Sequence, residues 1–289
     1  MPALVLLVAS LLLFGGCSGS KQGDSSPATS TKHEVVLPSD AAELQTLLET
    51  ASPELRIAIK GKLRRLEGLA TLSFERVAVI GASLSAGFGG LQISTALDGA
   101  IAGEHQNINL ASVFFFKSPN ENGRDQLDQA IDQDASVIFA LDILFWYAYI
   151  NASLDSRMSS LERGLRNLER ASVPIILGDI PDMRTGQPWM LPPEVIPPPE
   201  HLAKLNARVH EWARARLNVH LVPLAAWSEA LVSGGTLVVE PGKPPVPAKS
   251  LVHIDGLHPN PKGVRYMLMR LDPSLEIAFP DTDQAALAF

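Results

Sequence analysis

The chain has 289 residues, of which 46% are hydrophobic, and its formal net charge is −7. It is long enough to bury one sizeable core. Its charged residues form no long blocks, so the sequence offers no basic surface for nucleic acid or for anionic lipid, and we expect no nucleic-acid partner.

The first residues have the pattern of an export signal. Residues 3–14 are an apolar segment too short to cross a bilayer as a mature helix, and small residues follow it. Cys17, the only cysteine, comes directly after Phe14, Gly15 and Gly16. This segment resembles the lipobox of bacterial lipoproteins, in which the cysteine receives the lipid and becomes the mature N-terminus. The alternative is an ordinary secreted protein with an incidental free thiol.

This resemblance implies a lipid anchor at Cys17 and a place in the bacterial cell envelope, and Ser18 resembles the signal that directs such lipoproteins to the outer membrane. We therefore expect residues 1–16 to be a signal peptide. Residues 17–38 are rich in Ser, Gly, Thr, Lys and Asp and predict a flexible tether. Residues 39–75 carry leucines at helical spacing, interrupted near Pro53, and predict two helices packed on the main domain, 76–289.

The main domain alternates apolar runs with helical segments. We expect strands at 76–80, 107–111, 136–142, 173–178 and 219–223, and helices at 91–101, 123–133, 158–170 and 201–217. Continuously apolar strands that alternate with helices indicate a parallel sheet covered on both faces, so the predicted class is α/β with three layers. Two proline-rich stretches, 187–200 and 240–250, predict surface loops that cannot join a sheet or helix. The alternative is that they form the walls or lid of a pocket, because loops beyond the carboxyl ends of parallel strands line the ligand crevice.

A serine follows the first predicted strand in the stretch "VIGASLSAG". Ser83 would stand at the carboxyl end of that strand, near unpaired backbone N–H groups, which suits a nucleophile whose attack generates an oxyanion. The other interpretation is a serine that caps a helix after a tight turn. The G-x-S-x-G pattern of α/β-hydrolases does not fit, because Ser85 stands where its second glycine would be.

An aspartate and a histidine three residues apart occur near the end of the chain, in "VHIDGLHPNPKGVRYM". A turn of this length lets the Asp255 carboxylate reach Nδ1 of His258 and leaves Nε2 to accept the proton of Ser83. One alternative is a plain polar turn. A second is a metal site that uses His253, Asp255 and His258, but no H-E-x-x-H or cysteine-rich pattern accompanies them, and we expect neither a metal nor a cofactor.

Together these motifs resemble the SGNH, or GDSL, hydrolase family over residues 76 to about 271: "GASLSAGFG" is similar to its first block and "LHPNPKGVRYM" to its last. The resemblance implies a flavodoxin-like three-layer fold and ester hydrolysis through an acyl-enzyme. In it Ser83 is the nucleophile, His258 the general base and Asp255 the residue that orients the base. Ala82 departs from the family, which usually has Asp there.

The middle blocks of the family are altered. Phe114 stands where the family's oxyanion-hole glycine would be, Leu141 replaces the asparagine of its Gly-x-Asn-Asp motif, and only Asp142 is kept. Substitute donors are the Ser83 N–H and four polar residues of the second loop: Asn109, Ser112, Ser118 and Asn120. Asp142 cannot donate when ionised, so we expect it to cap the next helix or to accept backbone N–H bonds from the Ser83 loop.

Other residues near the predicted sheet edge have less specific interpretations. The aromatic group Phe145, Trp146, Tyr147 and Tyr149 is either helix core or an apolar wall for an acyl or aromatic group. Asp179 and Asp182 predict helix capping and loop hydrogen bonds, with substrate contact as the alternative. Asn206, Arg208, Arg214 and Arg216 predict a solvated helix face.

The sequence thus predicts an SGNH-type serine hydrolase acting on an ester bond, with a small-molecule, lipid or glycan ester as substrate. It leaves two alternatives open. The scaffold can be a binding or structural envelope lipoprotein that has lost turnover, because two oxyanion donors are replaced. The same triad can also transfer acyl groups to a sugar.

Overall fold

In a computed structural model of the chain, the described residues are 41–52, 55, 56, 59, 63, 72–101, 103–239 and 243–271. All of them belong to one compact unit, Leu37–Phe289. The predicted signal peptide 1–16 and tether 17–38 lie outside the described residues. The first helix predicted within 39–75 is α1 (Ala41–Thr50), and the second lies largely outside them.

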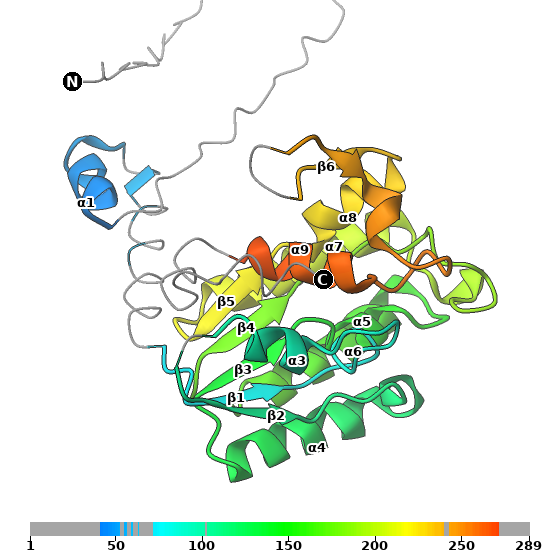
Figure 1. The fold of residues 1–289 in the computed structure, drawn as a ribbon, viewed down its shortest axis with the longest axis horizontal. Coiled ribbons are helices and arrows are strands. Elements are labelled where there is room, and N and C mark those ends of the chain that lie inside the picture. Colours follow the sequence, from blue (N-terminus) through cyan, green and yellow to red (C-terminus); the bar gives the residue numbers. More distant parts are fainter. Residues whose placement is uncertain are drawn as a thin grey trace, which may run out of the picture. The chain divides into compact units, whose positions relative to one another are not determined.

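Five parallel strands form the central sheet in the order β2-β1-β3-β4-β5 (Figure 1). They are β1 (Arg76–Val79), β2 (Gln106–Asn109), β3 (Val137–Ala140), β4 (Ile175–Gly178) and β5 (Val219–Val222). All five predicted strands are present, slightly shortened. The predicted parallel sheet is confirmed, and its order is the flavodoxin-like one. Because the strands are parallel, the loops after β1 and β3 leave the same edge of the sheet, next to each other.

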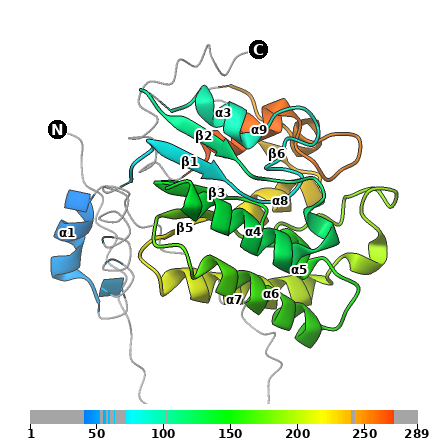
Figure 2. The same ribbon diagram turned by 90° about the horizontal axis from the view of Figure 1, so that it is seen from below.

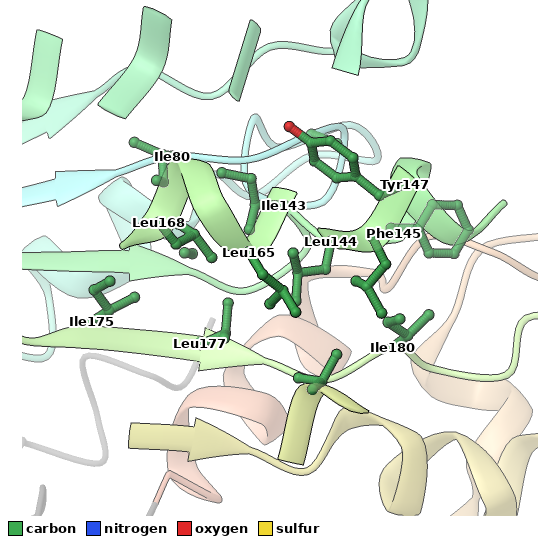
Figure 3. Packing of buried hydrophobic residues seen from close by; sticks show 14 of the residues in the cluster. Ile80, Ile143, Leu144, Phe145, Tyr147, Leu165, Leu168, Ile175, Leu177 and Ile180 are labelled. Carbon is green, nitrogen blue, oxygen red and sulfur yellow. The ribbon is translucent and has the colours of Figure 1, made fainter. Parts of the chain in front are cut away.

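Alternate residues of each strand face two separate cores. Ala78, Ile138 and Leu177 belong to one, together with residues of α4 (Pro119–Asp132), α5 (Phe145–Ala148), α6 (Leu154–Leu168) and α7 (Pro199–Arg214). Figure 3 shows part of it, with Leu165 and Leu168 of α6 over the sheet.

The other face of the sheet packs against different helices. Val77, Val137 and Ile176 belong to the second core, together with residues of α3 (Ile93–Asp98), α8 (Leu224–Val232) and α9 (Pro261–Met269). Figures 1 and 2 show helices on both faces of the sheet, so the three-layer prediction is confirmed.

Three of the four helices predicted in the main domain begin earlier than the apolar periodicity predicts, whereas α3, predicted at 91–101, begins two residues later and ends three residues earlier. α4 and α7 start at Pro119 and Pro199, where the fixed φ of proline suits the first turn, and α6 follows a capping Ser153 that accepts from the Ser156 N–H. Only the residues after these first turns carry the apolar pattern. The predicted starts of α4, α6 and α7 were therefore two to four residues late.

One segment of the fold was not predicted. α8 is followed by a hairpin of β6 (Thr236–Leu237) and β7 (Val246–Pro247) and by the short helix η3 (Ala248–Leu251). The stretch 240–250 is therefore only partly a loop. The other proline-rich stretch, 187–200, is a loop with one short helix, η2 (Pro193–Val195), until α7 begins.

Candidate active site

The loop after β1 begins at a glycine that no other residue can replace without strain. Gly81 has φ +140°, and a Cβ there would lie 2.2 Å from Oδ1 of Asp142. The peptide groups of Gly81 are paired with a side-chain amide: its N–H donates to Oε1 of Gln126 at 2.7 Å, and its carbonyl accepts from Nε2 at 3.1 Å. These contacts fix the direction in which the chain leaves the strand.

Asp142, which follows β3, holds the next residues of this loop. Its carboxylate accepts from the N–H groups of Ala82 (2.9 Å), Leu84 (2.9 Å) and Ser85 (3.4 Å) and from Oγ of Ser85 (2.6 Å). Burial raises the pKa of the Asp142 carboxyl, and these hydrogen bonds act in the opposite direction. Of its two predicted structural uses, the structure shows the bonds to the Ser83 loop. The helix-cap alternative is wrong, because α5 has no side-chain cap.

The structure brings Ser83, His258 and Asp255 together. Oγ of Ser83 lies 2.9 Å from Nε2 of His258, although the two residues are 175 positions apart in the chain. On the far side of the ring, Nδ1 of His258 lies 2.8 Å from Oδ2 of Asp255. His258 and Asp255 are each only 4% exposed. This is the geometry of a hydroxyl, a base and an orienting carboxylate.

The turn that carries Asp255 and His258 is fixed at several points. Oδ1 of Asp255 accepts from the N–H groups of Leu257 (2.9 Å) and His258 (3.0 Å). The Gln187 N–H donates to the Asp255 carbonyl at 2.7 Å, and Oγ1 of Thr185 donates to the Gly256 carbonyl at 2.8 Å. The proline-rich stretch that begins at Gln187 thus supports the turn.

These bonds set the charge of the orienting residue. Burial of Asp255 raises its pKa, but the N–H groups of His258 and Leu257 and the His258 ring outweigh that effect, so the pKa of the carboxyl lies below its ordinary value. Asp255 is therefore ionised at neutral pH and accepts the Nδ1 proton of His258. Nε2 is then the acceptor that faces Ser83.

One backbone donor stands at the nucleophile. Within the described part of the chain the Ser83 N–H donates to no protein acceptor, unlike its neighbours Ala82 and Leu84, which bond Asp142. This N–H is available to an oxyanion formed at Ser83.

Among the described residues, none of the side chains predicted as further donors forms a hydrogen bond with Ser83, although the Ser112 N–H donates to the Gly81 carbonyl at 3.1 Å and so keeps that loop next to the Ser83 loop. Oδ1 of Asn109 accepts from the Ala111 N–H, and Oγ of Ser112 accepts from the Phe114 N–H, both within their own loop. Asn120 lies in α4 and contacts Asn167 of α6. Ser118 stands at the start of α4 without capping it.

The two positions where the family pattern is broken hold apolar side chains. Phe114 is 58% exposed, whereas Leu141 is 1% exposed and belongs to the core. Neither residue restores a side-chain donor.

An apolar pocket of about 120 Å³ adjoins the triad, with both Ser83 and His258 in its wall. Its other walls come from the loops after β3 and β4, from α8 and α9, and from the segment that joins these two helices. Ala248, at the end of the second proline-rich stretch, lines it, as that prediction required. No residue of 187–200 does.

The aromatic group after β3 divides between its two predicted roles. Phe145 lines the pocket, while Tyr147 and Tyr149 are buried in the core. The Tyr149 ring stacks on Phe145 at 3.9 Å between ring centres, so the core supports this part of the wall.

The remaining polar predictions are partly confirmed. Asp179 accepts from the Ala225 N–H at the start of α8, and Asp182 accepts from the Arg184 N–H, which are the predicted capping and loop bonds. The solvated-face prediction is wrong for Asn206, whose amide pairs with the N–H and carbonyl of Ile180. Arg214 is exposed as predicted, while Arg208 and Arg216 are partly exposed and form ion pairs with Glu162 and Glu169.

Two residues of the site were missed. Gln126 is a polar residue on the otherwise apolar face of α4 that contains Leu127 and Ala130, and this break in the pattern was a usable signal. Phe88 packs its ring 4.5 Å from that of His258, a contact that no local pattern indicates.

Among the described residues, no three His, Cys, Asp or Glu side chains are placed to hold a metal ion. His253, the third residue of the metal alternative, packs against the backbone of Gly89 instead. None of the described helices is both long and apolar enough to cross a bilayer.

No protein-family model and no curated protein sequence matches this chain. Among solved structures, an acetylxylan esterase from Geobacillus stearothermophilus matches with 15% identity over 73% of this chain and 96% of its own, at a TM-score of 0.47. A GDSL-like lipase from Bacteroides thetaiotaomicron matches with 16% identity, 74% and 97% coverage and a TM-score of 0.46. The esterase EstA from Pseudoalteromonas sp. has 15% identity, 70% and 99% coverage and a TM-score of 0.46. At such scores these likenesses are too partial to assign an activity to this chain.

Proposed function

We propose that this protein is an SGNH-type serine hydrolase that cleaves ester bonds. The observation that carries the proposal is the chain of contacts from Oγ of Ser83 through His258 to Asp255, at 2.9 and 2.8 Å. The position of Ser83 directly after the first strand, and of the Asp255 turn directly before the last helix, agrees with the motifs that resemble that family.

The chemistry follows from the positions of the three side chains. Oγ of Ser83 attacks the ester carbonyl while Nε2 of His258 takes its proton, and Asp255 stabilises the imidazolium. His258 then gives that proton to the departing alcohol, which leaves an acyl group on Ser83. Water, deprotonated by His258, attacks this acyl-enzyme, and the acid and free Ser83 are released.

The altered oxyanion donors limit the rate of this reaction. The Ser83 N–H is one donor that the described residues offer, Phe114 and Leu141 replace two others, and removal of one donor from a complete oxyanion hole costs about a hundredfold or more in rate. We therefore expect turnover well below that of a hydrolase with a full set of donors. The same observation supports the second candidate, a binding or structural protein that keeps the scaffold without turnover.

The two candidates are separated by hydrolysis of p-nitrophenyl acetate and p-nitrophenyl butyrate with the full-length chain and with Ser83→Ala. The proposal expects release of p-nitrophenol by the wild type and a loss of at least about a hundredfold in Ser83→Ala. Equal rates in the two proteins would reject the enzyme and favour the binding protein.

We also propose that Cys17 carries a lipid that holds the protein in the bacterial cell envelope. Support comes from the sequence alone, because Cys17 lies outside the described residues. Expression of the wild type and of Cys17→Ser in a Gram-negative host tests it. The wild type is expected in the membrane fraction and Cys17→Ser outside it, and the same distribution for both would refute the anchor.

A further inference from the structure

The pocket beside Ser83 is built largely by the part of the fold between β5 and α9. Leu231 comes from α8, Leu237 from β6, Ala248 and Leu251 from η3, and Tyr266 from α9. These walls belong to the segment that follows the last strand of the sheet. Most of the pocket wall therefore comes from residues outside the five-stranded sheet, and Ser83 and His258 also line the pocket.

The walls offer almost nothing to a charged or polyhydroxylated group. Among the residues that the structure describes, no lysine or arginine lines the pocket. Both oxygens of Asp142 accept hydrogen bonds from the Ser83 loop. Oγ of Ser228 donates to the Ala225 carbonyl and accepts from the Asp182 N–H. A sugar ring or a carboxylate placed here would lose most of its bonds to water, because beyond Ser83 and His258 the wall offers it the Trp227 indole N–H and the Tyr266 hydroxyl against a mostly apolar lining.

The pocket wall contains the atom that holds the acyl group during turnover. In the proposed reaction the acyl carbon stays bonded to Oγ of Ser83 through both half-reactions, whereas the alcohol must leave toward solvent. A pocket with Ser83 in its wall therefore contacts the acyl part in every step, and binding there stabilises the transition states as well as the ground state.

We propose that this pocket binds the acyl chain of the substrate, and that the substrate is an ester of an uncharged aliphatic acid of about four to six carbons rather than an acetylated glycan. The size follows from the volume of about 120 Å³, since an apolar cavity of about 150 Å³ in another protein holds benzene. This inference rests on the proposed hydrolase function and names the substrate class of the same site.

The first test uses the wild type and two series of esters. In p-nitrophenyl acetate, butyrate and hexanoate the leaving group is constant, and kcat/KM is expected to rise about fourfold for each added methylene, which corresponds to about 0.8 kcal/mol. In a series of acetate esters with longer alcohols, kcat/KM is expected to change little. Fastest turnover of the acetate ester, or a rise confined to the alcohol series, would overturn the proposal.

The second test alters the pocket without touching the triad. Leu231→Trp adds volume to the wall and is expected to reduce the hexanoate-to-acetate ratio of kcat/KM at least tenfold. Glu229→Trp is the matched control, because Glu229 is exposed on the same helix and does not line the pocket. An unchanged ratio in a folded Leu231→Trp would overturn the proposal.

A third measurement covers the case in which Leu231→Trp does not fold. The rate at which alkyl fluorophosphonates label the wild type is expected to rise from the methyl to the butyl compound, and a flat series would contradict the pocket. Different results would reject the acyl-pocket proposal and the hydrolase proposal. If Ser83→Ala abolishes turnover but the chain-length series is flat, only the pocket assignment is lost.

Discussion

At the scale of single residues, Asp142 holds the loop that carries Ser83 in its conformation. Its buried carboxylate accepts from the N–H groups of Ala82, Leu84 and Ser85 and from Oγ of Ser85. The residue stands at the end of β3, and the loop it holds begins at the end of the neighbouring β1. Because β1 and β3 are neighbours in the sheet, the Asp142 carboxylate lies next to the N–H groups of the Ser83 loop.

Replacement of Asp142 by alanine is expected to lower the free energy of unfolding by about 3–5 kcal/mol, because it leaves N–H donors without an acceptor. Urea denaturation of the two proteins measures the change. Asp125→Ala removes an exposed aspartate paired with Arg124 and is expected to change stability by less than about 0.5 kcal/mol. A similar small effect for Asp142→Ala would show that the loop holds without it.

Gly81 is constrained both by its backbone angle and by its neighbours. In Gly81→Ala the new methyl group would meet Asp142 at 2.2 Å, with φ at +140°. We expect a loss of about 3–5 kcal/mol of unfolding free energy. Gly234→Ala also places alanine at positive φ, +69°, but meets nothing within 4 Å, and is expected to cost only about 1 kcal/mol. Equal midpoints for the two variants in thermal unfolding would contradict this account.

At the scale of elements, α9 is held in place by its capping residue. Oδ1 of Asn260 accepts from the Gly263 N–H at 3.1 Å, and Nδ2 donates to the Ser250 carbonyl at 2.8 Å. The cap therefore ties the start of α9, two residues after His258, to η3.

Asn260→Ala is expected to cost about 1 kcal/mol, or a fall of about 2–4 °C in Tm. Ser118→Ala is the control, since Ser118 precedes α4 without a side-chain cap bond and its loss is expected to leave Tm within about 1 °C. Calorimetry measures the Tm of both variants. Equal changes in Tm for Asn260→Ala and Ser118→Ala would show that the Asn260 cap does not stabilise the fold.

The turn that carries Asp255 gives the protein a predictable response to acid. The pKa of Asp255 is lower in the folded chain than in the unfolded chain, where it is about 3.9. The ionised carboxylate therefore contributes stability above that value, and the contribution is lost as the pH falls through the folded pKa.

The difference in unfolding free energy between the wild type and Asp255→Asn is accordingly expected to be constant from about pH 7 to pH 5 and to shrink below about pH 4. Guanidinium denaturation at several pH values measures it. A difference that stays constant down to pH 2 would mean that Asp255 is not held as a carboxylate by its turn.

Local sequence patterns predict some elements of this fold and miss others. The strands were predictable because Val137–Ala140 and its neighbours are continuously apolar, as buried parallel strands are. α8 was missed because its sequence, "LAAWSEALV", is apolar on most sides and lacks a clear period. The β6–β7 hairpin was missed because its strands have two residues each and one contains Pro247.

The same distinction applies to the candidate site. Ser83, Asp255 and His258 occur in short motifs next to a strand or a helix, so their proximity was predictable from the parallel topology. The apolar pocket was predictable only in part. Sequence patterns indicated a wall at Phe145 and at Ala248, but Leu84 and Leu231 carry no such pattern, and only tertiary packing brings them to the same pocket.

At the scale of the whole molecule, the sheet and α9 bring together two segments of the chain that the sequence keeps 175 positions apart. Ser83 lies in the loop that follows β1, and His258 reaches the same edge of the sheet just before α9. The proposed chemistry depends on this strand order. Asp255 and His258 are neighbours in the sequence, but only the fold brings Ser83 to them.

Covalent labelling of the full-length chain with a fluorophosphonate, followed by mapping of the labelled peptide, tests the central claim most directly. The account predicts one label per chain on Ser83, none on Ser85, and labelling at least about a hundredfold slower in His258→Ala. A label on another serine, or equal labelling of the wild type and Ser83→Ala, would contradict it.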